Sequence, residues 1–193
     1  MRLHALHSSF VMLLAWSLIT GILYPVVVTG IAQTFMHYEA NGSIVRDGGI
    51  PVGSRIVGQY FSASKYFWGR PSATEGVPNN SLASGGSNLG PSNPLLVDLI
   101  KNRIQTLRKM DPENSASIPI DLVTASGSGL DPEISLAAAR YQISRIAKAR
   151  HLMPGSIEAL VEKYAVPAHP FSWQEPRVNV LDLNLALDRM ESS

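Results

Sequence analysis

Two short stretches rich in glycine and serine are the parts of this sequence best suited to hold a ligand. They are residues 84–90 (SGGSNLG) and residues 126–129 (SGSG). Backbone amides exposed in such turns can converge on an anion, for example a phosphate group. The commoner use of these residues is to permit tight turns. The sequence alone leaves both interpretations open.

The complete motifs for nucleotide binding or nucleophilic catalysis are absent. A Walker A loop needs Gly-Lys followed by Ser or Thr, and the chain contains no Gly-Lys dipeptide. A dinucleotide fingerprint, GxGxxG, begins at Gly127 but has Pro132 in the position of the third glycine. A GxSxG nucleophile elbow begins at Gly85 but ends in Leu89. We therefore expect no catalytic residue in this chain.

The sequence also argues against a metal site or a tightly bound cofactor. No pair of histidines has the HExxH spacing or a neighbouring acid that suggests a metal ligand set. Paired acids such as Glu158 and Glu162 fit a solvated helix surface. The chain has no cysteine, which excludes disulfides, thiolate catalysis and cysteine-ligated metals. The five histidines are His4, His7, His37, His151 and His169.

One long apolar stretch organises the chain. Residues 10–31 contain no Asp, Glu, Lys or Arg, and 22 helical residues span about 33 Å, enough for a bilayer core of roughly 30 Å. We predict a short tail over residues 1–9 and a transmembrane helix over residues 10–32. A secretory signal peptide is the alternative, with a cleavage site near Ala32, but its apolar region would be shorter.

The charges beside this stretch predict its orientation. Arg2, the α-amino group, His4 and His7 lie on the N-terminal side, whereas the far side has no Lys or Arg before Arg46. The positive-inside rule then predicts a single-pass protein with a cytoplasmic N-terminus and an extracytoplasmic domain over residues 33–193.

The helix carries features that suit contact with another helix. Ser17 and Gly21 form a small-xxx-small pair, which allows close helix approach. Pro25 cannot donate a hydrogen bond to the carbonyl of Gly21, so a bend is expected there. We predict partner helix packing at Ser17, Gly21 and Pro25, although these residues could simply tolerate lipid.

The rest of the chain has the size of one domain. Residues 39–193 hold 15 acidic and 15 basic residues, a net formal charge of zero, which argues against nucleic-acid binding. Sequence patterns predict an α+β domain that follows a linker or surface turn over residues 39–53. The expected elements are strands over 54–61 and 118–122, helices over 94–110, 135–151 and 156–165, and a last helix capped by Asn179 that reaches Met190. The basic face expected for the helix over 135–151 consists of Arg140, Arg145, Lys148 and Arg150.

Residues 69–93 form a long segment without helical or strand periodicity. Such a length is uncommon in a compact domain unless the loop is functional or disordered. The segment is poor in charge and has no simple repeat. We therefore favour an ordered functional loop over disorder.

Nine short motifs are distributed along the chain. They are TG at 20–21, YP at 24–25, GRPSA at 69–73, ASGGSNL at 83–89, SNP at 92–94, VTAS at 123–126, SGLD at 128–131, RIAKAR at 145–150 and NLALD at 184–188. Together, and in the same order, these motifs resemble one protein family, the KdpC family, the C subunit of the bacterial high-affinity potassium-transporting Kdp ATPase. The resemblance runs along the whole chain, and it departs at Ser81, where proline is expected.

The resemblance implies a role in a complex of the bacterial inner membrane. Its partners would be a channel-like potassium-selective subunit, a P-type ATPase subunit and a small single-span subunit. The C subunit is described as an assembly factor and as a catalytic chaperone that raises the ATP affinity of the ATPase subunit. ATP would be reached through that subunit, and the nucleotide-contact residues implied by position are Ser126, Gly127, Ser128, Gly129 and Gln142.

The predicted orientation conflicts with direct nucleotide contact, because ATP is cytoplasmic and these residues would lie outside. We therefore favour an indirect role in which the external domain covers the outer mouth of the potassium-selective subunit. Two alternatives are an external solute-binding or sensor module with one anchor, and a secreted hydrolase beginning near Gln33. The residues predicted for the partner-contact loop are Gly69, Arg70, Pro71, Ser84, Gly85, Gly86, Ser87 and Asn88.

Overall fold

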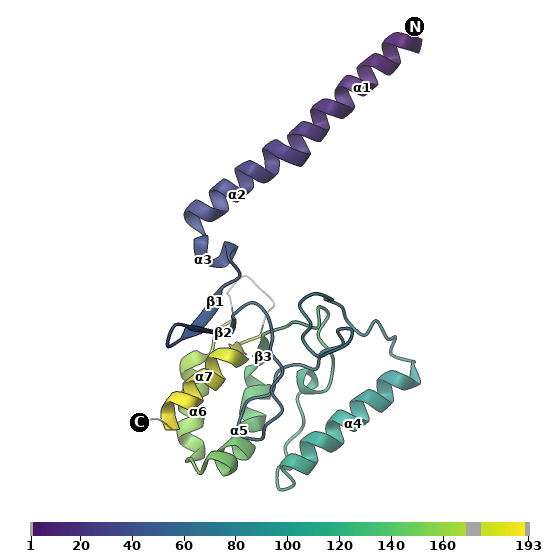
Figure 1. The fold of residues 1–193 in the computed structure, drawn as a ribbon. Coiled ribbons are helices and arrows are strands. Elements are labelled where there is room, and N and C mark those ends of the chain that lie inside the picture. Colours follow the sequence, from purple (N-terminus) through teal and green to yellow (C-terminus); the bar gives the residue numbers. More distant parts are fainter. Residues whose placement is uncertain (1, 169–174, 192–193) are drawn as a thin grey trace. The chain divides into compact units, whose positions relative to one another are not determined.

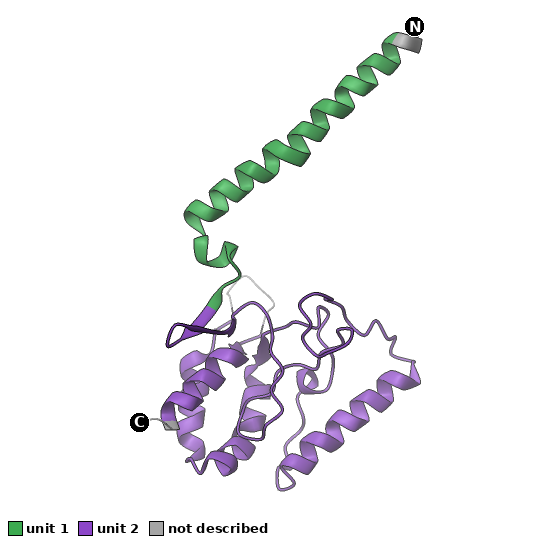
Figure 2. Cartoon of the chain, viewed as in Figure 1, with its two compact units in different colours: residues 1–44 green, residues 45–193 purple. Residues whose placement is uncertain are grey.

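The computed structural model describes residues 2–168 and 175–191. The chain divides into two compact units, Met1–Ile44 and Val45–Ser193 (Figure 2). His169 of the sequence analysis lies outside the described residues.

The N-terminal unit is dominated by one long apolar helix. It consists of α1 (Arg2–Leu18), a π-helical turn η1 (Ile19–Leu23) and α2 (Tyr24–Phe35), followed by the short α3 (His37–Ala40). Over His4–Phe35 this helix is long and apolar enough to cross a membrane, and its most apolar window has no buried residue. The expected long helix is therefore confirmed, while the positions of the bilayer surfaces along it stay a prediction.

The irregularity expected at Pro25 takes the form of the π-helical turn. The amide of Tyr24 donates to the carbonyl of Ile19, five residues earlier. In a regular helix the ring of Pro25 would clash with the carbonyl of Gly21. A wider turn immediately before the proline relieves this clash, and such turns are frequent at functional positions.

The C-terminal unit mixes helices with short strands, which confirms the α+β prediction (Figure 1). Strands β1 (Ile44–Asp47) and β2 (Ile50–Ser54) pair, and β3 (Glu133–Ser135) pairs antiparallel with β4 (Arg177–Asn179). The helices are α4 (Pro94–Met110), α5 (Leu136–Arg150), α6 (Pro154–Tyr164) and α7 (Val180–Glu191), with a 3-10 turn η2 (Ile120–Leu122).

The hydrophobic core lies among α5, α6, α7 and the β3–β4 pair. Phe67, which belongs to none of these elements, also contributes a fully buried ring. Burial of such side chains is the main favourable term in folding this unit. The largest buried apolar side chains are Phe67, Ile134, Ile146, Ile157, Val161, Val178, Leu183 and Leu187.

The helix starts follow the capping residues that the sequence contains. The side chain of Asn93 accepts a hydrogen bond from the amide of Leu95 at 3.0 Å, and that of Asn179 accepts from Asp182 at 3.1 Å. Ser135 caps α5 in the same way, accepting from Ala138. Each cap satisfies an amide that lacks a partner within the helix. The four predicted helices are thus confirmed, with ends shifted by a residue or two.

The strand predictions were wrong. The expected strand over 54–61 is a turn after β2, with a single bridge between Ser54 and Val57. The strand expected over 118–122 is the 3-10 turn η2, in which the amide of Leu122 bonds the carbonyl of Pro119. β-branched residues favour a strand only where a neighbouring strand is available.

The linker expected over residues 39–53 is wrong, because most of this stretch is regular structure, whereas the alternative of a turn holds for Gly48 and Gly49. It contains the end of α3 and the paired strands β1 and β2. Gly48 and Gly49 connect these strands with φ of +54° and +85°. Glycine pairs adopt the left-handed conformations that two-residue hairpin turns require.

Candidate functional site

The segment before the long loop, a turn at residues 63–66 followed by Phe67 and Trp68, is held by side chains rather than by a neighbouring strand. We call residues 63–68 the clamped segment. Asn184 accepts from the amide of Phe67 at 2.8 Å and donates to its carbonyl at 3.0 Å. Gln142 does the same for Trp68, at 2.8 and 3.1 Å. Each carboxamide therefore supplies the donor and the acceptor that a paired strand would supply.

Two arginines of α5 bind further carbonyls of the clamped segment. Arg145 donates to the carbonyls of Ser64 and Tyr66 and to the Gln142 side chain, and its guanidinium lies 4.2 Å from the centre of the Trp68 ring. Burial lowers the pKa of Arg145 to about 10, so it stays protonated at neutral pH. A buried cation is tolerated where carbonyl oxygens and an aromatic face replace its water.

Arg150 secures the same segment from the end of α5. It donates to the carbonyl of Lys65 at 2.7 Å and to Asp188 of α7 at 2.8 Å. The hydroxyl of Tyr66 donates to the other carboxylate oxygen of Asp188 at 3.1 Å. These contacts tie the clamped segment to both helices at once.

Sequence reasoning misjudged these helix residues. The basic face expected for the helix over 135–151 included Arg145 and Arg150, but they are only 4% and 7% exposed. The Asn184 contact was missed as well. One available signal was spacing: Gln142, Arg145 and Arg150 interrupt or flank the apolar stripe that contains Ile146. Polar residues at such positions often satisfy buried backbone groups.

The position of Gln142 bears on the nucleotide contact implied by the family resemblance. Its side chain is 1% exposed, and both of its polar atoms bind protein groups. No hydrogen bond within the described residues joins Gln142 to residues 126–129. Contact with a nucleotide would require Trp68 and Arg145 to lose these bonds, so the structure offers a structural role for Gln142.

The two glycine-serine stretches, forty residues apart in sequence, pack directly on each other. The carbonyl of Ser128 accepts from the amide of Gly85 at 2.9 Å and from the hydroxyl of Ser84 at 3.0 Å. A Cβ on Gly86 would lie 2.8 Å from the carbonyl oxygen of Gly127. Backbone can approach backbone this closely only because side chains are absent.

Gly129 and Pro71 extend this contact. Gly129 has φ of +68°, and a Cβ there would lie 2.6 Å from the carbonyl oxygen of Gly85. The carbonyl of Pro71 accepts from the amide of Ser126 at 3.1 Å. Residues 69–93 are therefore an ordered loop anchored on residues 126–129. We call residues 69–93 and residues 126–129 together the paired loops.

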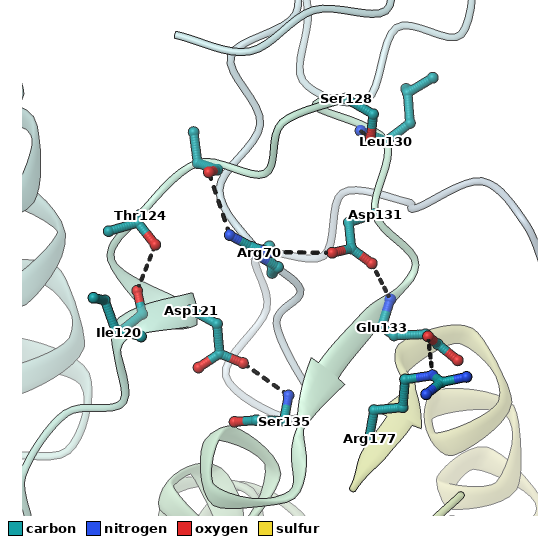
Figure 3. Close-up of polar contacts among 11 residues, drawn as sticks. Arg70, Ile120, Asp121, Thr124, Ser128, Leu130, Asp131, Glu133, Ser135 and Arg177 are labelled. Atoms are coloured by element: carbon teal, nitrogen blue, oxygen red, sulfur yellow. Dashed lines mark hydrogen bonds and ion pairs between the residues drawn. The ribbon is translucent and has the colours of Figure 1, made fainter. Parts of the chain in front are cut away.

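Arg70, at the start of the long loop, connects this loop to the residues on either side of the 126–129 stretch (Figure 3). Its guanidinium donates to the carboxylate of Asp131 at 3.2 Å and to the carbonyl of Ala125 at 3.3 Å. Asp131 also accepts from the amide of Glu133 at the start of β3. Through Asp131, Arg70 thus connects the loop to strand β3. An ion pair between Glu133 of β3 and Arg177 of β4, at 2.6 Å, joins the two strands.

The candidate anion-binding turn, residues 126–129, uses some of its backbone amides in hydrogen bonds within the domain. The amides of Ser126 and Gly129 bond the carbonyls of Pro71 and Ser126, and that of Leu130 bonds the Ser128 hydroxyl. The amides of Gly127 and Ser128 make no hydrogen bond within the described part of the chain. Both of these residues are exposed, so at most two amides of the stretch are available to an anion.

The other predicted site residues lie at the surface or near it. Ser17, Gly21 and Pro25 are exposed on the long helix, and Gly21 lies within the π-helical turn. In the loop, Gly69 and Ser87 are half-buried and Asn88 is exposed. No group of three or more metal-ligating side chains occurs in the described ranges 2–168 and 175–191.

Taken together, the fold and the site define a protein with one helix of membrane-spanning length and an α+β domain that holds an ordered surface loop. Comparison with known proteins identifies the family. The family described as "K+-transporting ATPase, c chain" (KdpC) matches residues 6–189. The chain belongs to this family, and it is therefore an accessory, non-catalytic subunit of a potassium-transporting ATPase complex.

Individual relatives agree with this assignment. The "Potassium-transporting ATPase KdpC subunit" of Methylibium petroleiphilum is 53% identical over 183 residues, 95% of this chain and 96% of the relative. The protein with the same description from Ralstonia nicotianae is 54% identical over 182 residues, 94% and 89% of the two chains. That from Polynucleobacter asymbioticus is 55% identical over 172 residues, 89% and 91% of the two chains.

Replacing Gln142 tests the clamp. In Gln142→Ala the amide and carbonyl of Trp68 and one donor of Arg145 lose their partner. An unpaired buried polar group costs about 1–3 kcal/mol. We therefore expect the free energy of unfolding of the full-length protein, measured in denaturant, to fall by at least that amount. Gln105→Ala, on the exposed side of α4, should change the free energy of unfolding by less than about 0.5 kcal/mol. Equal effects of the two substitutions would contradict the clamp.

Glycine substitutions test the paired loops. Gly86→Ala forces a Cβ against the carbonyl of Gly127, whereas Gly90→Ala meets nothing within 4 Å. Overpacking of this kind costs about 1–3 kcal/mol, so the amide of Gly85 should exchange its hydrogen about fivefold faster or more in Gly86→Ala. Gly90→Ala should leave this rate unchanged. Unaltered Gly85 exchange in both variants would mean that the close approach is not required.

Proposed function

We propose that this chain stabilises the assembled potassium-transporting ATPase complex, and that it raises the ATP affinity of the P-type ATPase subunit without binding the nucleotide itself. The observation that carries the proposal is an ordered loop with an exposed apolar tip. The base of the loop is fixed by Arg70 and by residues 126–129, while Leu82 is 95% exposed. An apolar side chain held on an ordered base loses little conformational freedom when another protein covers it.

The long helix supplies a second contact in this proposal. In a bilayer, helices associate through close packing of small residues rather than through hydrophobic burial. Gly21 has no atom within 4 Å of the position of a Cβ, and the π-helical turn beside Ser17 and Pro25 alters the backbone there. We propose that a helix of the channel-like subunit or of the small single-span subunit packs on this face.

The proposal also includes the location of the chain in the membrane. We propose that the chain is a single-pass protein of the bacterial inner membrane with a cytoplasmic N-terminus. The domain over residues 33–193 would then lie outside, at the outer mouth of the potassium-selective subunit. From there it can influence ATP affinity only by stabilising one conformation of its partners. Direct ATP contact by residues 126–129 and Gln142 remains the prediction of the family resemblance.

The loop tip provides the test of partner contact. Leu82→Asp leaves the domain folded because the side chain makes no buried contact, and it places a charge in the proposed interface. We expect about tenfold less partner protein to co-purify with the tagged chain, or more, as for a central interface residue. Met153→Asp, at a position 75% exposed before α6, should leave co-purification unchanged. Full complex recovery with Leu82→Asp would refute the loop as a contact.

The orientation has a direct test. A C-terminal tag on the full chain should be digested by added protease in intact spheroplasts and protected in inverted membrane vesicles. The reverse pattern would put the domain in the cytoplasm. In that case the external role would be wrong, and direct nucleotide contact would become the leading mechanism.

A further inference from the structure

Helix α4 is the least buried long helix among the described parts of the C-terminal unit. Of its side chains only Leu107 is buried, while Ile100 and Ile104 are half-buried against the core. Leu95 and Met110, near its two ends, are exposed. Figure 1 shows α4 at the side of the domain, away from the group formed by α5, α6 and α7. Its surface is available to a partner.

The charge of α4 is strongly one-sided. It contains four basic residues and one acidic residue, Asp98, a net charge of +3, although the whole chain has a net charge of only +1. Within the described residues no ion pair involves α4, in contrast to Arg140 and Lys148 of α5, which both pair with acids. The basic residues are Lys101, Arg103, Arg108 and Lys109.

A cleft of about 410 Å³ runs along one side of this helix. One wall is formed by Arg103, Leu107 and Met110 of α4, and the other includes Tyr60, Phe61 and Trp68. The volume is within the range of sites that hold a ligand or a partner's side chains. Because the second wall includes the end of the clamped segment and the base of the paired loops, its shape is fixed by the internal contacts described above.

Two guanidinium groups line this cleft, and each donates a hydrogen bond to a carbonyl of the same short stretch of chain. Arg103 donates to the carbonyl of Val123 at 2.8 Å, and Arg70 donates to that of Ala125, two residues further. Arg70 is neutralised by Asp131, but Arg103 has no acidic partner in the described part of the chain. Burial lowers the pKa of Arg103, which reflects a partly desolvated positive charge without a counterion.

We propose that this cleft binds an acidic segment of a partner protein in the complex. A carboxylate of the segment would pair with Arg103, and an adjacent apolar side chain would pack against Tyr60 and Met110. Aromatic residues beside arginine are typical of interface hot spots, and the net charge of α4 favours approach of an acidic surface. The inference rests on the proposed function and specifies the chemistry of one of its contacts.

A lipid surface fits α4 less well. Membrane-surface helices need a continuous apolar face. Here the middle of the apolar stripe, from Ile100 to Leu107, packs against the protein's own core. The exposed apolar residues Leu95 and Val97 lie near one end of the helix and Met110 at the other, and the cleft has a fixed aromatic wall suited to side chains.

The test uses the complete complex, co-expressed and purified through a tag on this chain. Arg103→Glu should reduce the partner protein recovered by about tenfold or more, because it places like charges in the contact. Arg108→Glu makes the same charge change on the exposed side of α4 and should reduce recovery less than twofold. Equal recovery with the two variants would overturn the proposal.

A second measurement keeps the proposal testable if Arg103→Glu fails to fold. A photocrosslinking residue, p-benzoylphenylalanine, replaces Thr106, which lines the cleft, or Gln105 as the control position. Crosslinking from position 106 to an acidic segment of a partner, but not from 105, supports the proposal. Crosslinking to lipid alone, or to no partner, overturns it. If Leu82→Asp dissociates the complex and Arg103→Glu does not, the proposed function stands and this inference fails. If neither dissociates it, the proposed loop contact and this inference both fail.

Discussion

The domain depends on satisfying the peptide groups of a segment that has no neighbouring strand. Buried amides and carbonyls without partners are costly, and Phe67 places such groups inside the core. Asn184 and Gln142 each bind both the N–H and the C=O of one residue, Phe67 and Trp68 respectively, while Arg145 binds the carbonyls of Ser64 and Tyr66. Since these side chains come from α5 and α7, the same bonds that bury Phe67 also fix the two helices relative to the segment.

The surface of the domain follows from this buried arrangement. The clamped segment leads directly into Arg70 and Pro71, whose contacts with Asp131 and Ser126 set the start of the long loop. From there the glycines of residues 84–90 and 126–129 allow backbone to lie against backbone. Irregular structure is thus held without a sheet, and its rigidity lets an exposed side chain such as Leu82 act as a contact at low entropic cost.

Sequence patterns predicted those parts of the fold that local signals determine. The helices were predictable because caps such as Asn93 and Ser135 and apolar spacing lie within a few residues of each other. Strands β3 and β4 have three residues each, and more than forty residues of sequence separate them. The strands are too short, and too far apart, for a sequence pattern to reveal that they pair. The contact of Gly85 with Ser128 is likewise long-range. Arg145 was wrongly expected to be exposed, because charge alone predicts exposure. In the structure, backbone carbonyls and the Trp68 ring take the place of water around its guanidinium group. The predicted site residues of the loop were brought together by the fold; the functions proposed for them depend on partners.

The measurement that tests this account most directly is native-state hydrogen exchange of the Phe67 and Trp68 amides in the full-length protein. If side chains of α5 and α7 hold the clamped segment as part of the core, these two amides will exchange only through global unfolding, at the same free energy as the amide of Ile146 in α5. Exchange of Phe67 and Trp68 at the rate of exposed loop amides, with Ile146 still protected, would contradict the account: the segment would then be a local loop, and the surface beyond it would not depend on Gln142 and Asn184.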